Sequence, residues 1–302
     1  MHDHSHAHTH ADAAHGERRL LVAFALTALT LVAEAVGGWI SGSLALLADA
    51  GHMLVDAAAL LFAWLGVHSA RRPADARRSF GYARLEILVG YSNALLQFVL
   101  VAWIAAEALM RLAAPPPVRS GTMLAVATVG LLVNAFVLRS LGRHDHDDLN
   151  AAGAYLHVLG DLLGSLGAML AALLIGAFGW RWADPVVSML VSLLIVGGAW
   201  RLLRRSAHVL LEGTPDGIEG GAIAAALERA TEVTDVHHVH VWQLAGRRSV
   251  ATLHARVARD ADPNAAIASV QRFLHDRFGI AHATVQIESV GCADERCDGD
   301  AH

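Results

Sequence analysis

Long runs of apolar residues, each long enough to cross a bilayer, fill most of the first two thirds of the sequence. They predict six membrane-spanning helices, at about residues 20–40, 44–67, 85–110, 121–138, 151–178 and 183–203. Roughly 20 apolar residues in a helix span the hydrocarbon core of a bilayer, about 30 Å thick. The short break Ser41-Gly42-Ser43 makes the first two helices antiparallel neighbours, and Pro115-Pro116-Pro117 ends the third. The pattern therefore predicts an all-α membrane bundle of six transmembrane helices.

After about residue 205 the hydropathy falls, and the pattern becomes that of a small soluble domain. Residues 215–230 and 263–278 have helical periodicity, whereas residues 236–244, 250–257 and 282–290 alternate as strands. The order αββαβ predicts a compact α+β unit, ferredoxin-like or metallochaperone-like, with its helices on one face of a three-stranded sheet. A domain this small has a thin core and gains from pairing with a second copy, so we expect a homodimer.

These patterns divide the chain into four parts. Residues 1–17 form a histidine-rich tail, 18–205 the transmembrane domain, 206–290 a cytoplasmic dimerisation and metal-sensing domain, and 291–302 a C-terminal tail. In a six-span arrangement most arginines fall on one side of the bilayer, and cytoplasmic loops are the ones enriched in arginine and lysine. We therefore place the N- and C-termini in the cytoplasm and the protein in the inner (plasma) membrane.

Composition agrees with a membrane protein. Of the 302 residues 55% are hydrophobic, and the mean hydropathy is +0.43, which exceeds that of an average soluble protein. The net charge of -5 gives no sign of a nucleic-acid partner. The two cysteines, Cys292 and Cys297, show no disulfide framework and fit a reducing compartment or a soft metal site. The polar N-terminus lacks the apolar core of a cleavable signal.

Two of the predicted spans carry ionisable residues in their middle, where each charge costs roughly 2.5–3.5 kcal/mol by insertion scales. His52 and Asp56 are four residues apart in the second span, and His157 and Asp161 repeat the spacing in the fifth. Residues four apart share one face of a helix. Two imidazoles and two carboxylates brought together make a four-ligand tetrahedral set that suits Zn2+. The alternative, that these groups only bond helices together, explains the cost of four ionisable groups less well.

Other polar residues of the spans have simpler interpretations. Glu34, Asn93, Gln97 and Asn134 are predicted to form hydrogen bonds between helices. Asp49, one turn before His52, is either an outer-shell or proton-carrying group or a structural residue at a helix end.

Histidine is unusually frequent, with 19 copies in the chain. Six of them suggest a weak zinc-collecting tail, with a disordered segment of no consequence as the alternative: His2, His4, His6, His8, His10 and His15. His144 and His146 allow a similar interpretation. For His237, His238 and His240 in the first predicted strand, metal sensing and dimer packing are both open.

The combination of these features resembles the cation diffusion facilitator family over nearly the whole chain. Besides the paired His-x-x-x-Asp motifs, the segments Ser43-Leu44-Ala45-Leu46-Leu47-Ala48-Asp49 and Ser79-Phe80-Gly81-Tyr82 are similar to its bacterial zinc exporters. The resemblance implies a homodimeric antiporter, not an enzyme, that exports cytoplasmic Zn2+ in exchange for protons. It also implies that the transported ion is held by His52, Asp56, His157 and Asp161.

The resemblance also implies metal positions outside the spans. In the C-terminal domain they fall on His237, His254, Gln286 and Glu288, so His237, His254 and Glu288 are the expected ligands, with Gln286 a weaker amide. Some relatives have a further site between the second and third spans, formed by an aspartate and two histidines. Here Arg78 and Tyr82 stand where those histidines would follow Asp75, so we expect no metal there.

Three classes of function are compatible with an intramembrane metal site. A proton-coupled transporter is favoured, because zinc binding to imidazole and carboxylate expels protons. An intramembrane metalloenzyme would need an open coordination position and a base, usually in a His-Glu-x-x-His motif, which the sequence lacks. A metal sensor would bind the metal ion without transporting it across the membrane. Imidazole and carboxylate also accept Cd2+, Co2+ and Ni2+, so selectivity stays open, as does the number of protons exchanged.

Overall fold

The computed structural model describes residues 25–70, 75–141, 149–245 and 248–288; within them the side chains of residues 60, 63–70, 140, 141, 149–157 and 245 are left out. The tails at residues 1–17 and 291–302, with their histidines and cysteines, lie outside the described residues, as do His144 and His146. The chain divides into two compact units, Met1–Leu61 with Ser92–Arg201, and Phe62–Tyr91 with Leu202–His302. Each unit is considered by itself.

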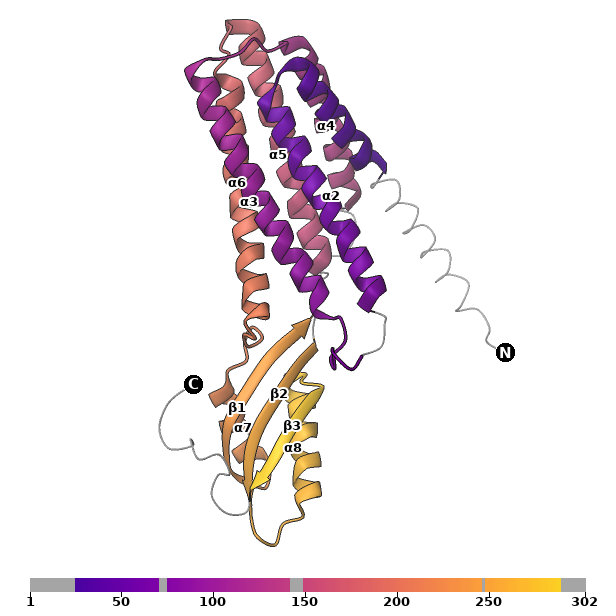
Figure 1. Ribbon diagram of the computed structural model, residues 1–302, viewed down its shortest axis with the longest axis vertical. Coiled ribbons are helices and arrows are strands. Elements are labelled where there is room, and N and C mark those ends of the chain that lie inside the picture. The colour runs from indigo at the N-terminus through magenta and orange to yellow at the C-terminus, as the bar shows by residue number, and fades with distance from the viewer. Residues whose placement is uncertain (1–24, 71–74, 142–148, 246–247, 289–302) are drawn as a thin grey trace, which may run out of the picture. The chain divides into compact units, whose positions relative to one another are not determined.

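Long helices make up the first two thirds of the described chain, and α2 to α6 run side by side in Figure 1. The bounds are Ala25–Ser41 for the first helix, then Leu44–Ala70 (α2), Arg84–Ala113 (α3), Ser120–Leu141 (α4), Leu149–Phe178 (α5) and Ala183–Leu210 (α6). Among the described residues, four segments are long and apolar enough to cross a membrane: Arg84–Ala113, Ser120–Arg139, Val158–Phe178 and Ala183–Leu210. The third to sixth predicted spans are therefore confirmed. The first two predicted spans are helical where the structure describes them. The described part of the first, Ala25–Ser41, is shorter than a membrane span.

Helix α2 contributes to both buried apolar clusters that the structure describes in the helical unit. Leu44 and Ala48 on α2 pack against Ile104 and Ala108 of α3. On its other side, Ala45 and Leu46 join a cluster whose further members come from α4, α5 and α6: Met123, Ala127, Ala168, Ala171, Ala172, Ile175 and Ala183. Lipid tails are as apolar as the side chains, so helices in a bilayer associate through close packing of small residues. The many alanines in these clusters give α2 such neighbours.

The N-terminus of α2 is capped by a carboxylate from α6. Asp184 is fully buried; its Oδ1 accepts hydrogen bonds from Ser43 Oγ at 2.6 Å and Ala45 N at 3.1 Å, and its Oδ2 accepts one from Leu44 N at 2.7 Å. The first N–H groups of a helix have no partner within the helix, and a negative charge there also complements the helix dipole. Arg111 of α3 lies 3.9 Å from Asp184 and donates to the Gly42 carbonyl at 2.6 Å. Three helices are thus tied together where α2 begins.

The second unit contains the predicted αββαβ domain. Its elements are α7 (Gly220–Ala230), β1 (Val233–Ala245), β2 (Arg248–Val257), α8 (Pro263–Phe278) and β3 (His282–Glu288). The sheet order is β1-β2-β3, with β1 and β2 antiparallel and β2 and β3 parallel. Both helices lie behind the sheet in the view of Figure 1. The core comes from the helices and the inner face of the sheet, including Ile223, Leu227, Leu253, Val270 and Leu274.

Local chemistry explains where the elements of this domain begin and end. Helix α8 starts at a capping Asp262, which accepts a hydrogen bond from Asn264 N, and it ends at Gly279 with φ +67°. The prediction that α7 begins near residue 215 is wrong, because Pro215 and Ile218 close a turn in which Gly217 has φ +78°. Strand β1 also begins three residues earlier than predicted, at Val233.

The Asp184 cap can be tested by replacing Asp184 with alanine. Three buried donors would lose their acceptor, and hydrogen bonds to charged groups are worth about 1.5–3 kcal/mol each. We expect a clearly lower thermal unfolding midpoint for Asp184→Ala in detergent. The control is Ser192→Ala, a buried residue of the same helix whose hydroxyl donates only to the Ser188 carbonyl. Equal midpoints for the two variants would contradict the assigned cap.

Candidate metal sites

The α2 helix places His52 and Asp56 on one face, one turn apart. His52 Nε2 lies 3.6 Å from Asp56 Oδ2, and both side chains are largely buried. The residues come together because four positions make slightly more than one helical turn. This is the geometry that the spacing predicts.

Helix α5 brings Asp161 to the same place. Asp161 Oδ1 lies 4.0 Å from His52 Nε2, and Asp161 is only 4% exposed. One imidazole nitrogen therefore has a carboxylate oxygen from each of two helices within 4.0 Å. His157 belongs to α5, four residues before Asp161, but its side chain lies outside the described residues. The structure thus brings together three of the four predicted transport ligands and leaves the fourth as a prediction.

Amide side chains of α3 support Asp56. Gln97 Nε2 donates to Asp56 Oδ1 at 2.6 Å, and Asn93 Nδ2 donates to the same oxygen at 3.3 Å. These donors occupy Oδ1, whereas Oδ2 is the oxygen nearer His52. Since the groups that orient a ligand can matter nearly as much as the ligand itself, Asn93 and Gln97 belong to the site. The sequence predicted them as hydrogen-bond donors between helices but not their shared acceptor.

The other polar residues of the bundle are placed as follows. Asn134 donates to Ser165 Oγ at 3.3 Å, so α4 and α5 are bonded as predicted. Glu34 is fully buried, and its carboxyl lies beside the Ser165 hydroxyl of α5, which is its side-chain hydrogen-bond partner. Asp49 is buried inside the bundle, five residues after α2 begins, so it does not have the helix-end role considered for it.

A close approach of α5 to α2 accompanies this site. A Cβ atom built on Gly164 of α5 would lie 3.0 Å from Asp49 Oδ1, tighter than most contacts of a real Cβ. The absence of a side chain at Gly164 therefore lets α5 lie against α2, one turn after Asp161.

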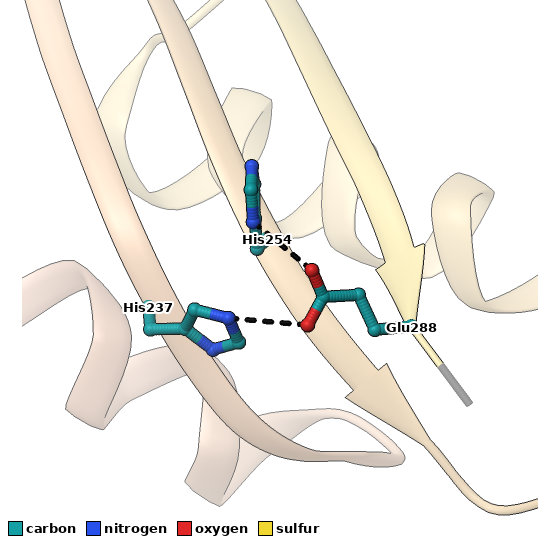
Figure 2. A group of neighbouring side chains, drawn as sticks. All are labelled: His237, His254 and Glu288. Atoms are coloured by element: carbon teal, nitrogen blue, oxygen red, sulfur yellow. Dashed lines mark ion pairs between the residues drawn. The ribbon is translucent and has the colours of Figure 1, made fainter. Parts of the chain in front are cut away.

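A second cluster lies on the sheet of the C-terminal domain. His237 of β1 and His254 of β2 are directly paired, and Glu288 ends β3 (Figure 2). His237 Nε2 lies 3.2 Å from Glu288 Oε2, and His254 Nδ1 lies 3.1 Å from Glu288 Oε1. The candidate ligand atoms all lie within 4.8 Å of one another. The structure therefore brings the three predicted residues together in a set of donors that suits zinc.

Residues around the sheet cluster hold its members in place. Gln286 Nε2 donates to Glu288 Oε1 at 3.2 Å, so Gln286 orients the carboxylate. Asp235 Oδ2 lies 3.5 Å from His237 Nδ1 and 3.1 Å from an Arg256 nitrogen. A carboxylate beside one ring nitrogen fixes the tautomer that leaves the other nitrogen free to bind a metal.

The loop before α3 uses Asp75 differently. Its Oδ1 accepts from the backbone N–H groups of Arg77 and Arg78, each at 2.8 Å, and its Oδ2 accepts from the Tyr82 hydroxyl at 3.0 Å. The pKa of Asp75 is held below its ordinary value, chiefly by the hydrogen bond from the Arg77 backbone N–H. The hydrogen bond from the Tyr82 hydroxyl acts in the same direction. The carboxylate of Asp75 thus organises the loop.

Comparisons with known proteins cover nearly all of the chain. Residues 20–211 match a family model described as the cation efflux transmembrane domain, and residues 215–290 match the cation efflux protein cytoplasmic domain. The chain is 47% identical to the zinc transporter ZitB of Escherichia coli, covering 98% of this chain and 95% of the relative. It is 39% identical to the metal cation efflux system protein CzcD of Cupriavidus metallidurans, and the match covers 95% of this chain and 90% of the relative. It is also 36% identical to a cadmium, cobalt and zinc/H(+)-K(+) antiporter of Bacillus subtilis, and the match covers 89% of this chain and 88% of the relative.

The contact between α5 and α2 can be tested with two glycine variants. Gly164→Ala forces Asp49 and α5 apart, whereas a Cβ on Gly160 would meet nothing within 4 Å. Both changes gain the same helix propensity, about 1 kcal/mol, so their difference isolates the contact. We expect Gly164→Ala to unfold at a lower temperature than Gly160→Ala in detergent and to bind zinc more weakly. Indistinguishable variants would refute the assigned close approach.

Proposed function

The chain belongs to the cation efflux family, whose members are metal cation transporters and not enzymes, and we propose on that premise that it exports Zn2+ from the cytoplasm in exchange for protons. The ion would be held within the bundle by His52, Asp56, His157 and Asp161. The protein would act as a homodimer in the inner membrane, with both termini in the cytoplasm, and protect the cell from excess zinc.

One observation carries the proposal. Two carboxylates on different helices face a single imidazole nitrogen at 3.6 and 4.0 Å, inside an apolar bundle. Ionisable groups in a membrane interior are costly, and they mark ion pathways and proton relays. An imidazole and two carboxylates form a donor set for zinc and similar divalent ions, and the relatives named as zinc transporters favour zinc.

The same residues account for coupling to protons. Zinc needs a neutral imidazole and ionised carboxylates, so binding expels protons, and protonation expels zinc. When the site faces the cytoplasm, zinc displaces protons from His52 and its neighbours. When it faces a more acidic exterior, protons displace zinc. The ligands are then reset for the next cycle without any further chemical step.

The membrane potential makes coupling necessary for export. Moving two positive charges outward against about 100 mV costs roughly 4.6 kcal/mol, at about 2.3 kcal/mol for each charge. One proton entering offsets about half of this cost, before any pH gradient is counted. The relative from Bacillus subtilis is named as an antiporter, which supports an exchange mechanism.

The cluster on the sheet supports a second role for zinc. We propose that zinc bound by His237, His254 and Glu288 regulates transport from the cytoplasmic domain, whose family model is named for the cytoplasmic part of cation efflux proteins. Glu288 is almost fully buried, and a bound cation would compensate its charge. Filling the cluster at high cytoplasmic zinc would tie all three strands together.

Zinc flux into proteoliposomes, followed with a zinc-sensitive dye under an imposed proton gradient, tests export. We expect gradient-dependent uptake by the unmodified protein and a loss of at least about 100-fold in Asp161→Asn, because a ligand would be lost. Asp276→Asn makes the same chemical change at an exposed residue and should transport normally. Repeating the assay with Cd2+ and Co2+ measures selectivity. Zinc binding with no flux under any gradient would favour a metal sensor instead.

Zinc regulation is tested by Glu288→Gln, which removes the charge and one ligand of the sheet cluster. The zinc concentration that gives half-maximal flux should rise about 10-fold or more, because loss of a metal-orienting group already weakens binding by that amount. The maximal rate should change less. An unchanged zinc dependence in a variant that is still dimeric would exclude a regulatory role for the cluster.

A further inference from the structure

Strand β1 contains a bulge at the histidine-rich segment His237-His238-Val239-His240. His237 pairs with His254 and His240 pairs with Thr252, so His238 and Val239 together lie opposite one residue of β2. His238 has φ +49°, in the left-handed region that few residues with a side chain adopt. Bulges of this kind re-aim side chains and occur next to functional sites.

The bulge changes where the His238 side chain lies. Successive side chains of a regular strand point to opposite faces, so His237 and His238 should be separated by the sheet. Instead, the ring centre of His238 lies 5.6 Å from that of His237 and 5.1 Å from that of His254. The rings of His237 and His254 are 5.4 Å apart. Three imidazoles thus gather around one region of the sheet.

These separations match imidazoles that share one zinc ion. Zinc binds imidazole nitrogen at about 2.0–2.1 Å, and the ring centre lies about 1.1 Å beyond, so two rings at a tetrahedral angle have centres about 5 Å apart. All three observed separations lie close to this value. His240, by contrast, lies 6.5 Å from His238, after the strand has resumed its regular register.

We infer that His238 is the fourth ligand of a closed zinc site formed by His237, His238, His254 and Glu288. The ligand atoms of the other three residues already lie within 4.8 Å of one another, and His238 is not in that set. The closed site therefore requires a rotation of the His238 imidazole that turns one ring nitrogen toward the other three ligands. Gln286 lies beside the cluster as well, but its amide nitrogen donates to Glu288 and an amide oxygen is a weaker zinc ligand than imidazole.

The four-ligand arrangement has two consequences. A zinc site with four protein ligands has no open position, so it binds the ion without activating water. All four ligands come from one protomer, so each chain binds one ion whether or not it is paired with a second copy. The inference rests on the proposed function only for the identity of the ion.

The test uses the full-length protein in detergent with Asp161→Asn as background, so that binding at the sheet cluster dominates. In this background His238→Gly and the control His240→Ala are titrated with Zn2+ against a chelating dye. Glycine adopts a positive φ without strain, so the metal-free His238→Gly protein should unfold no earlier than the control. Its zinc affinity should nevertheless be at least about 10-fold weaker.

A second variant and a second metal guard against indirect effects. His238→Asn keeps a residue that tolerates the left-handed conformation and should lose zinc affinity as His238→Gly does. With Co2+ in place of zinc, the control should show the strong visible absorption of a tetrahedral site, and both His238 variants should lose it. Zinc affinity within threefold of the control in either variant would overturn the inference. Binding is measured without flux, so a failure of zinc export would leave this result unaffected.

Discussion

The structure depends on the need of every polar group inside an apolar bundle for a polar partner, which for several charged and amide side chains lies on another helix. Hydrocarbon offers no hydrogen bonds, so an unpartnered carboxylate or amide there is costly. Asp56 of α2 meets this need through Gln97 and Asn93 of α3, and His52 lies between carboxylates of α2 and α5. The contacts that stabilise the bundle therefore also gather the candidate metal ligands, so helix packing and the proposed ion binding depend on the same residues.

Helix α2 is where these constraints meet. Its N-terminus is held by Asp184 of α6, its middle carries His52 and Asp56, and both sides pack against small residues of neighbouring helices. A displacement of α5 or α6 relative to α2 would therefore change either the distance between His52 and Asp161 or the cap at the start of the helix. Alternating access needs such a linkage, because the ligand set must change its exposure without losing its members.

The two candidate metal sites differ in how their ligands are connected. In the bundle, ligands on separate helices can be drawn together or apart by small shifts, which suits an ion that must be released. In the cytoplasmic domain, His237 and His254 are paired across adjacent strands, and Glu288 lies on the next strand. Hydrogen-bonded strands fix the distances between their side chains, which suits a site that keeps the same geometry each time an ion binds. The proposed transport site and the proposed sensing site thus have different structural supports.

The sequence alone determined what depends on local periodicity. Apolar runs located the spans, the spacing of four residues put His52 and Asp56 on one helix face, and alternation revealed the αββαβ domain. Tertiary structure decided what depends on contacts between distant segments. It identified Asp184 as the cap of a helix that begins 140 residues earlier, and it joined Asn93 and Gln97 to Asp56. It also showed the bulge that turns His238 toward His254, because a shift in strand register depends on the pairing of two strands and leaves no period in either one.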